Sequence, residues 1–202
     1  MPSPKSYDAT YFARWYRDRR HRVTTPAALA RKVRLTVGIA EQLLERPVRS
    51  VLDIGCGEAP WRAVLRRLRP SVRYVGVDSS AYAVQRYGAS RGIIDGSFGT
   101  LSTLPLRGTF DLIVVCDVLQ YIPDHELPMG LAAISARLGG VAYLEAYTTD
   151  DQLDGDKRSW HHRSAAFYRR QFARVGLTHV GMHCWVGDAL RENTTALERA
   201  GE

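Results

Sequence analysis

The stretch VLDIGCGE at residues 51–58 constrains the fold of this chain more than any other feature. Its first four residues are typical of a strand that is buried on both faces of a parallel sheet. Gly55 and Gly57 follow at once, and a helix is expected to begin at Pro60. Glycines allow a sharp turn and a close approach to a ligand, and the N-terminus of the next helix attracts negative charge. The stretch therefore predicts a strand, a glycine turn and a helix that together cradle a nucleotide-type ligand.

A second predicted strand at residues 74–77 supports this interpretation, because it ends in an acidic residue. Asp78 lies 25 residues after Asp53. An acid at the tip of the second strand of a βαβ unit commonly binds the two hydroxyls of a ribose.

Together, the segments VLDIGCG and YVGVDSS resemble the first two motifs of the class I S-adenosylmethionine (SAM)-dependent methyltransferases. The resemblance covers roughly residues 28–200 and implies SAM as the cofactor and S-adenosylhomocysteine (SAH) as the product. In that family the glycine loop contacts the methionine half of SAM. Ala59 stands where a third glycine is often found, and we expect it to be tolerated because the position needs only a small residue.

Two further strands end in residues that match later motifs of the family. Residues 92–94 run into Asp95, which the resemblance implies accepts a hydrogen bond from adenine, although Asp-Gly is also a common turn pair. Residues 110–115 are predicted to form a strand that runs into residues 116–123, and this stretch resembles the fourth motif, with Gln120 in place of the usual acid and Tyr121 in place of the usual histidine. The cofactor-binding residues implied in this way are Asp53, Gly55, Cys56, Gly57, Asp78, Ser79, Asp95, Gly96, Cys116 and Asp117.

Residues 1–25 form a separate aromatic and basic cap segment. Tyr7, Tyr11 and Trp15 recur at helical spacing between arginines, which predicts a short helix with an aromatic stripe facing the body of the protein. Two interpretations stay open: a helix packed on the edge of the domain, or a lid over the cofactor cleft as the family often has.

The order of the remaining elements predicts the fold class. Strands alternate with helices, which indicates an α/β fold with a doubly wound, mostly parallel sheet and helices on both faces. We expect a helix over residues 127–138 that ends at Gly139-Gly140, a strand over 141–147, and final strands over 178–186 and 193–198. The resemblance implies seven strands with the last one antiparallel. Residues 1–202 are expected to form a single domain.

A methyl acceptor that is a hydroxyl or an ammonium must lose a proton, which calls for a general base. His161 and His162 are candidates because histidine titrates near neutral pH and their loop follows the fifth predicted strand. They fit a surface loop or a helix cap equally well. Tyr121 is a further candidate, although it suits binding of cofactor or substrate better.

Charge and cysteine content limit the possible partners and the compartment. The net charge of +7 comes from 25 arginines against 3 lysines, spread over every predicted helix, which fits either a nucleic-acid surface or a bias in genome composition. Three widely spaced cysteines predict reduced thiols without a metal site. With no apolar run long enough for a membrane span and no signal peptide, a cytoplasmic protein is expected.

These observations predict a methyltransferase that acts on an O or N atom of a small-molecule acceptor. The chain lacks the Asn-Pro-Pro-aromatic or Asp-Pro-Pro-aromatic motif of amino-methylating enzymes and carries no added RNA-binding module. An RNA or protein methyltransferase remains an alternative, as does a SAM-binding regulator without turnover. The sequence makes no prediction of the acceptor's identity or of the oligomeric state.

Overall fold

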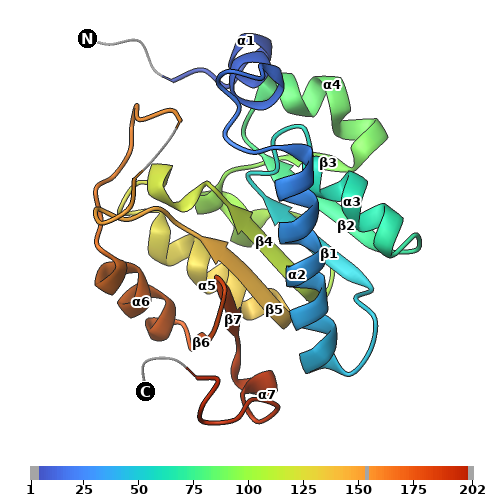
Figure 1. Ribbon diagram of the computed structural model, residues 1–202, viewed down its shortest axis with the longest axis vertical. Helices are drawn as coiled ribbons and strands as arrows, with labels where there is room; N and C mark the ends of the chain where they lie inside the picture. The colour runs from blue at the N-terminus through green and yellow to red at the C-terminus, as the bar shows by residue number, and fades with distance from the viewer. Residues whose placement is uncertain (1–4, 153–154, 200–202) are drawn as a thin grey trace.

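A seven-stranded mixed sheet organises residues 5–152 and 155–199, the part of the chain that the computed structural model describes (Figure 1). The strands are β1 (Ser50–Ile54), β2 (Arg73–Asp78), β3 (Ile93–Asp95), β4 (Phe110–Cys116), β5 (Leu138–Glu145), β6 (Thr178–Gly181) and β7 (Cys184–Val186). Their order in the sheet is β3-β2-β1-β4-β5-β7-β6. Strands β1 to β5 pair in parallel, whereas β7 is antiparallel to both of its neighbours. The predicted fold class is confirmed.

Helices cover both faces of this sheet. They are α1 (Ala9–Phe12), α2 (Pro26–Leu44), α3 (Pro60–Leu68), α4 (Ala81–Arg91), α5 (Leu127–Arg137), α6 (Ala165–Arg174) and α7 (Asp188–Arg191). Shorter turns are the π-helical η1 (Ala13–Arg17) and the 3₁₀ turns η2 (Phe98–Thr103) and η3 (Leu119–Tyr121).

Strand β4 shows how side chains divide between two cores. Leu112 and Val114 pack into the cluster that α2 and α3 cover, whereas Ile113 and Val115 pack into the cluster that α5 and α6 cover. All four side chains are fully buried. A continuous apolar run is therefore required in this central strand, since alternate residues face opposite layers.

Helix α2 begins where the sequence predicts. The Thr25 hydroxyl accepts a hydrogen bond from the Ala28 amide at 3.1 Å, and Pro26 occupies the first turn, where no intrahelical donor is needed. Within the described residues no helix is long and apolar enough to cross a membrane.

The prediction of a strand at residues 193–198 is wrong. Both final strands lie within residues 178–186, and residues 192–198 form turns after α7. The hairpin between β6 and β7 turns at Met182 and His183, both with positive φ angles, 49° and 61°. Asn-Gly or Asp-Gly usually signals such a turn, so the Met-His pair did not predict it.

The glycine pair at residues 139–140 also differs from its predicted role. Helix α5 ends at Arg137, and both glycines belong to β5, which begins three residues earlier than predicted. A Cβ on Gly140 would lie 2.0 Å from the carbonyl oxygen of Asp111 on the neighbouring strand. Close pairing of β4 and β5 therefore depends on glycine at this position.

We predict that Gly140→Ala lowers the free energy of unfolding by about 2–3 kcal/mol, because the added methyl forces two paired strands apart. Gly38→Ala is the matched control: nothing lies within 4 Å of its added Cβ, and it sits in α2. This control should gain about 0.5–1 kcal/mol, since alanine favours a helix. Urea unfolding of both variants measures the difference, and equal stabilities would contradict the close β4–β5 contact.

Candidate active site

The Asp78 carboxylate joins the tip of β2 to the glycine loop that follows β1. One oxygen accepts a hydrogen bond from the Gly57 amide at 2.6 Å, and the other accepts from the Ser80 amide at 2.8 Å. Burial raises the pKa of Asp78, and these two backbone donors oppose that rise. Asp78 also lines a cavity beside the glycine loop, so its remaining lone pairs face a potential ligand.

The glycine loop needs its glycines for conformation and for space. Gly55 and Gly57 have φ angles of +67° and +53°, in the left-handed region that favours glycine. A Cβ on Gly57 would lie 2.8 Å from Cε1 of Phe12, and one on Gly55 would lie 2.4 Å from Cγ2 of Val118. Ala59 has a φ of 55°, which gives a physical reason for the glycine often found there and shows that more than small size matters.

A cavity of about 280 Å³ lies at the carboxyl ends of the strands, between the glycine loop and the N-terminal segment, residues 5–25. Open α/β sheets bind their ligands at this edge. Of the residues predicted to form the site, those lining it are Tyr7, Tyr11, Trp15, Gly55, Gly57, Asp78, Ser79, Gly96, Asp117 and Tyr121. The structure thus brings together the predicted cofactor motifs and the aromatic N-terminal residues.

Four predicted cofactor residues lie outside the lining. Asp53 is buried beneath the loop, where its carboxylate accepts a hydrogen bond from the Tyr74 hydroxyl at 2.7 Å. Cys56 is buried against Gly76, and the Cys116 thiol donates to Glu145 at 3.0 Å. Asp95 is exposed at the end of β3. Its contact with adenine stays a prediction that the geometry does not favour.

Neither predicted histidine reaches the cavity. The backbone amide of His161 donates to the Gln120 carbonyl at 2.8 Å, and the exposed His162 ring packs on Trp160 with centroids 4.3 Å apart. A catalytic role for either histidine stays a prediction without support from their positions.

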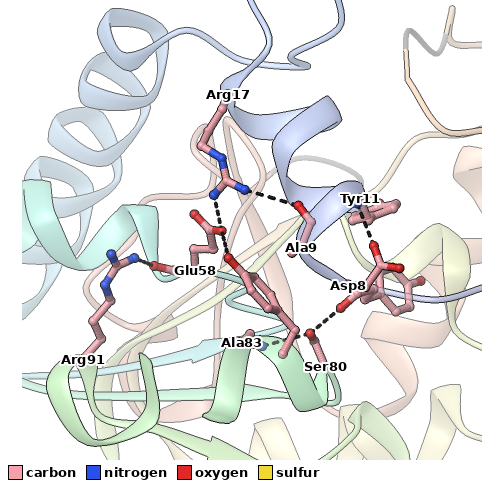
Figure 2. A network of polar contacts seen from close by, with 10 residues as sticks. Asp8, Ala9, Tyr11, Arg17, Glu58, Ser80, Ala83 and Arg91 are labelled. Carbon is pink, nitrogen blue, oxygen red and sulfur yellow. Dashed lines mark hydrogen bonds and ion pairs between the residues drawn. The ribbon is translucent and has the colours of Figure 1, made fainter. Parts of the chain in front are cut away.

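The N-terminal segment is attached to both cofactor motifs (Figure 2). The Ser80 hydroxyl donates to the Tyr7 carbonyl at 2.5 Å, and the Arg17 guanidinium donates to the Glu58 carboxylate at 2.5 Å. Ser80 lies two residues after Asp78, and Glu58 lies directly after Gly57, so each contact is made next to a cofactor motif. Asp8 caps α1 by accepting from the Tyr11 amide at 2.9 Å. These contacts hold the segment directly over the glycine loop.

The predicted aromatic stripe is only partly a packing surface. Phe12 is buried and stacks on Tyr82 of α4 with centroids 5.6 Å apart, whereas Tyr16 is 37% exposed. The helix continues from α1 into the wider π turn η1. Such turns are rare in proteins overall, and those that occur are often at functional sites. Tyr7, Tyr11 and Trp15 face the cavity from this segment.

The backbone at Asp117 lies in the left-handed region, which is strained for a residue other than glycine. Its φ angle is 60°, and the Gln120 side-chain amide donates a hydrogen bond to its carboxylate. Burial raises the pKa of Asp117 to about 6. Tyr121 lies beside it, donates to the Asp156 carbonyl at 2.6 Å, and has its pKa raised by burial.

Some residues of the cavity wall had no clear sequence signal. Phe98 and Val118 are ordinary apolar residues in sequence, while Glu126 and Asp156 are two acids among many. Residues 150–156 contain four aspartates, and nothing in the sequence distinguishes Asp156 from the other three.

A family model described as a methyltransferase domain matches residues 16–185. The chain belongs to this family. The match confirms the family that the motifs resemble, the class I SAM-dependent methyltransferases, and with it SAM as the cofactor of the domain.

Relatives and solved structures agree with this assignment. Trans-aconitate 2-methyltransferase of Deinococcus radiodurans is 32% identical over 107 residues, which are 53% of this chain and 41% of that protein. The enzyme of the same name from Afipia carboxidovorans is 28% identical over 167 residues, 78% of this chain and 62% of that protein. The chain thus spans less than two thirds of the length of these relatives.

Two solved structures share the fold. Streptomyces venezuelae DesVI superposes with a TM-score of 0.61 at 13% identity, covering 80% of this chain and 91% of that chain. The plantazolicin methyltransferase BpumL gives 0.61 at 14% identity, covering 84% and 74%.

The buried Asp53 yields a prediction about stability and pH. Burial raises its pKa to about 7, so the folded protein keeps this proton up to that pH, while the unfolded chain releases it near pH 4. Its contribution to stability is therefore full at low pH and is lost as pH rises from about 4 to 7. We expect Asp53→Asn to match the wild type near pH 4 and to exceed it by about 2–4 kcal/mol at pH 8.

Urea unfolding without cofactor at several pH values measures this difference. Asn can still accept from the Tyr74 hydroxyl, so the substitution removes the charge and keeps the contact. Equal pH dependence of the two proteins would show that Asp53 titrates normally.

Proposed function

We propose that this protein transfers the methyl group of SAM to an oxygen or nitrogen atom of a small-molecule acceptor. The observation that carries the proposal is the shared cavity, which the cofactor motifs bound on one side and the aromatic N-terminal segment bounds on the other. Bound SAM would supply a methyl group already activated by the sulfonium charge. The protein's own contribution is then to position both reactants and to exclude water.

The residues around the glycine loop fit the cofactor. Asp78 presents carboxylate oxygens at the tip of β2, where a ribose diol can donate to them. Gly55 and Gly57 let the backbone come close, and a side chain on either would enter occupied space. Ser79 and Gly96 complete this end of the cavity, and Phe98 adds an aromatic face that suits a base.

The size and enclosure of the cavity favour a small acceptor. Its volume of about 280 Å³ lies just below that of ligand pockets, roughly 300–1,000 Å³, so with the N-terminal segment in place it leaves little room beyond the cofactor. Tyr7, Tyr11 and Trp15 act in this proposal as a lid that must move for ligands to enter. A covered cavity supports an RNA or protein acceptor less well, because a polymer needs an open groove.

Asp117 is the group that we propose takes the acceptor's proton. It lines the cavity, and its pKa of about 6 suits a base at neutral pH. Tyr121 stays protonated at that pH, since burial raises its pKa and its hydroxyl donates to Asp156. Tyr121 therefore positions the acceptor in this proposal and moves no proton.

The relatives suggest where an acceptor screen should begin. Their name makes trans-aconitate one compound to test, together with small phenols, amines and other carboxylic acids. SAH release from SAM is the readout, and transfer to no compound by protein that binds SAH would contradict the proposal.

With the best acceptor, we predict that kcat/KM falls as the pH drops through about 6, because protonated Asp117 cannot take a proton. Asp117→Asn should lower kcat about 100-fold or more and remove this limb of the profile. Asp188→Asn, on α7 at the opposite end of the view in Figure 1 from α1, is the matched control and should keep the wild-type profile. A variant at position 117 that retains the limb would exclude Asp117 as the base.

A further inference from the structure

One cation lies enclosed in a cage of aromatic rings that also line the cavity. The side chain of Lys5 is only 6% exposed, and its ammonium lies 3.7 Å from the ring centroid of Tyr121. The rings of Tyr7 and Tyr11 lie 5.1 and 5.6 Å from the same nitrogen. Aromatic faces at these distances attract a cation, and the attraction grows when water is excluded.

A buried carboxylate completes the cage. Oδ2 of Asp156 lies 3.0 Å from the Lys5 ammonium, and its side chain is 7% exposed. The other oxygen accepts from the Arg158 amide at 3.0 Å, and the Arg158 guanidinium, 69% exposed, lies 3.7 Å away. Oδ2 receives no well-aligned hydrogen bond from the described residues, so this oxygen is directed at the ammonium alone.

The wall of the cavity carries negative charge. Asp78, Asp117, Glu126 and Asp156 line it, whereas no lysine, arginine or histidine does so among residues 5–152 and 155–199. Three tyrosines and a carboxylate form the same arrangement that binds ammonium ligands in aromatic cages. A tricarboxylate such as trans-aconitate would meet like charges on this wall.

We propose that the cage of Tyr7, Tyr11, Tyr121 and Asp156 is a cation subsite for the acceptor, that the acceptor carries an ammonium group, and that Lys5 fills the subsite when no acceptor is bound. This inference rests on the proposed function and names the class of its substrate. An acceptor ammonium would replace the Lys5 ammonium and make the same contacts.

The position of Lys5 makes such an exchange feasible. Burial lowers its pKa, which shows that enclosing this charge costs free energy even beside Asp156. Apart from Asp156 and the three rings, its polar contact is a long one, 3.4 Å from Nζ to the Arg158 carbonyl oxygen. Lys5 also belongs to the segment that covers the cavity, so its departure and the entry of a ligand are coupled.

Calorimetric titration with n-butylamine, protonated at pH 7.5, tests the proposal on the 202-residue chain saturated with SAH. Lys5→Ala should bind the amine about tenfold more tightly than the wild type, because the internal competitor is gone. Lys5→Met keeps the cage filled and should show no gain. Lys157→Ala removes an exposed positive charge next to Asp156 in the chain. This variant controls for net charge and should behave as the wild type.

Three comparisons complete the test. The double variant Lys5→Ala, Asp156→Asn should lose the gain. Neither 1-butanol nor trans-aconitate should bind more tightly to Lys5→Ala than to the wild type. Three results would each overturn the cation subsite: equal amine binding by Lys5→Ala and the wild type, an equal gain for 1-butanol, or tighter binding of trans-aconitate to Lys5→Ala than to the wild type. Binding of SAH is measured first: its failure in the wild type contradicts the proposed function, whereas intact SAH binding without an amine gain contradicts only this inference.

Discussion

The hydrogen bonds of the Asp78 carboxylate hold together the two loops that form the cofactor end of the cavity. They join the glycine loop after β1 to the start of α4 after β2. Ser80, whose amide is one of the two donors, also donates through its hydroxyl to the Tyr7 carbonyl. One buried carboxylate thus sets the shape of the cradle and, through its neighbour, the position of the segment that covers it.

The described structure therefore combines a rigid base with a cover held by few contacts. The base consists of parallel strands whose alternate residues fill two separate cores. The cover is a four-residue helix and a π turn, anchored at Glu58 and Ser80 and closed at its far end by the ion pair between Lys5 and Asp156. Because these contacts are few, opening of the cover costs far less than disruption of the sheet.

The sequence was sufficient for the fold class and for expecting the glycine loop and Asp78 at one edge of the sheet, because both depend on local patterns. The apolar run of β4, the Thr25-Pro26 helix start and the Gly-x-Gly turn each follow from neighbouring residues. The resemblance supplied the relation between distant motifs, and the order of strands confirmed it.

The remaining features depend on contacts between residues far apart in the chain. Lys5 and Asp156 are 151 residues apart, and Arg163 is buried because it donates to the Leu119 and Ile122 carbonyls. No local pattern marks such partners. The two histidines looked suitable by residue type alone, and the Met182-His183 pair at the centre of the hairpin turn is not one of the usual turn pairs.

Calorimetric titration of the wild type and Asp78→Ala with SAM and SAH measures how far cofactor binding depends on the Asp78 carboxylate. We predict micromolar-range binding to the wild type and binding at least about 100-fold weaker to the variant, since two hydrogen bonds to a charged group are lost. Asp188→Ala should bind as the wild type does, and thermal melting shows whether each variant is folded. Equal affinities of wild type and Asp78→Ala would contradict cofactor binding through Asp78, and a folded wild type that binds neither ligand would contradict SAM binding at this cavity.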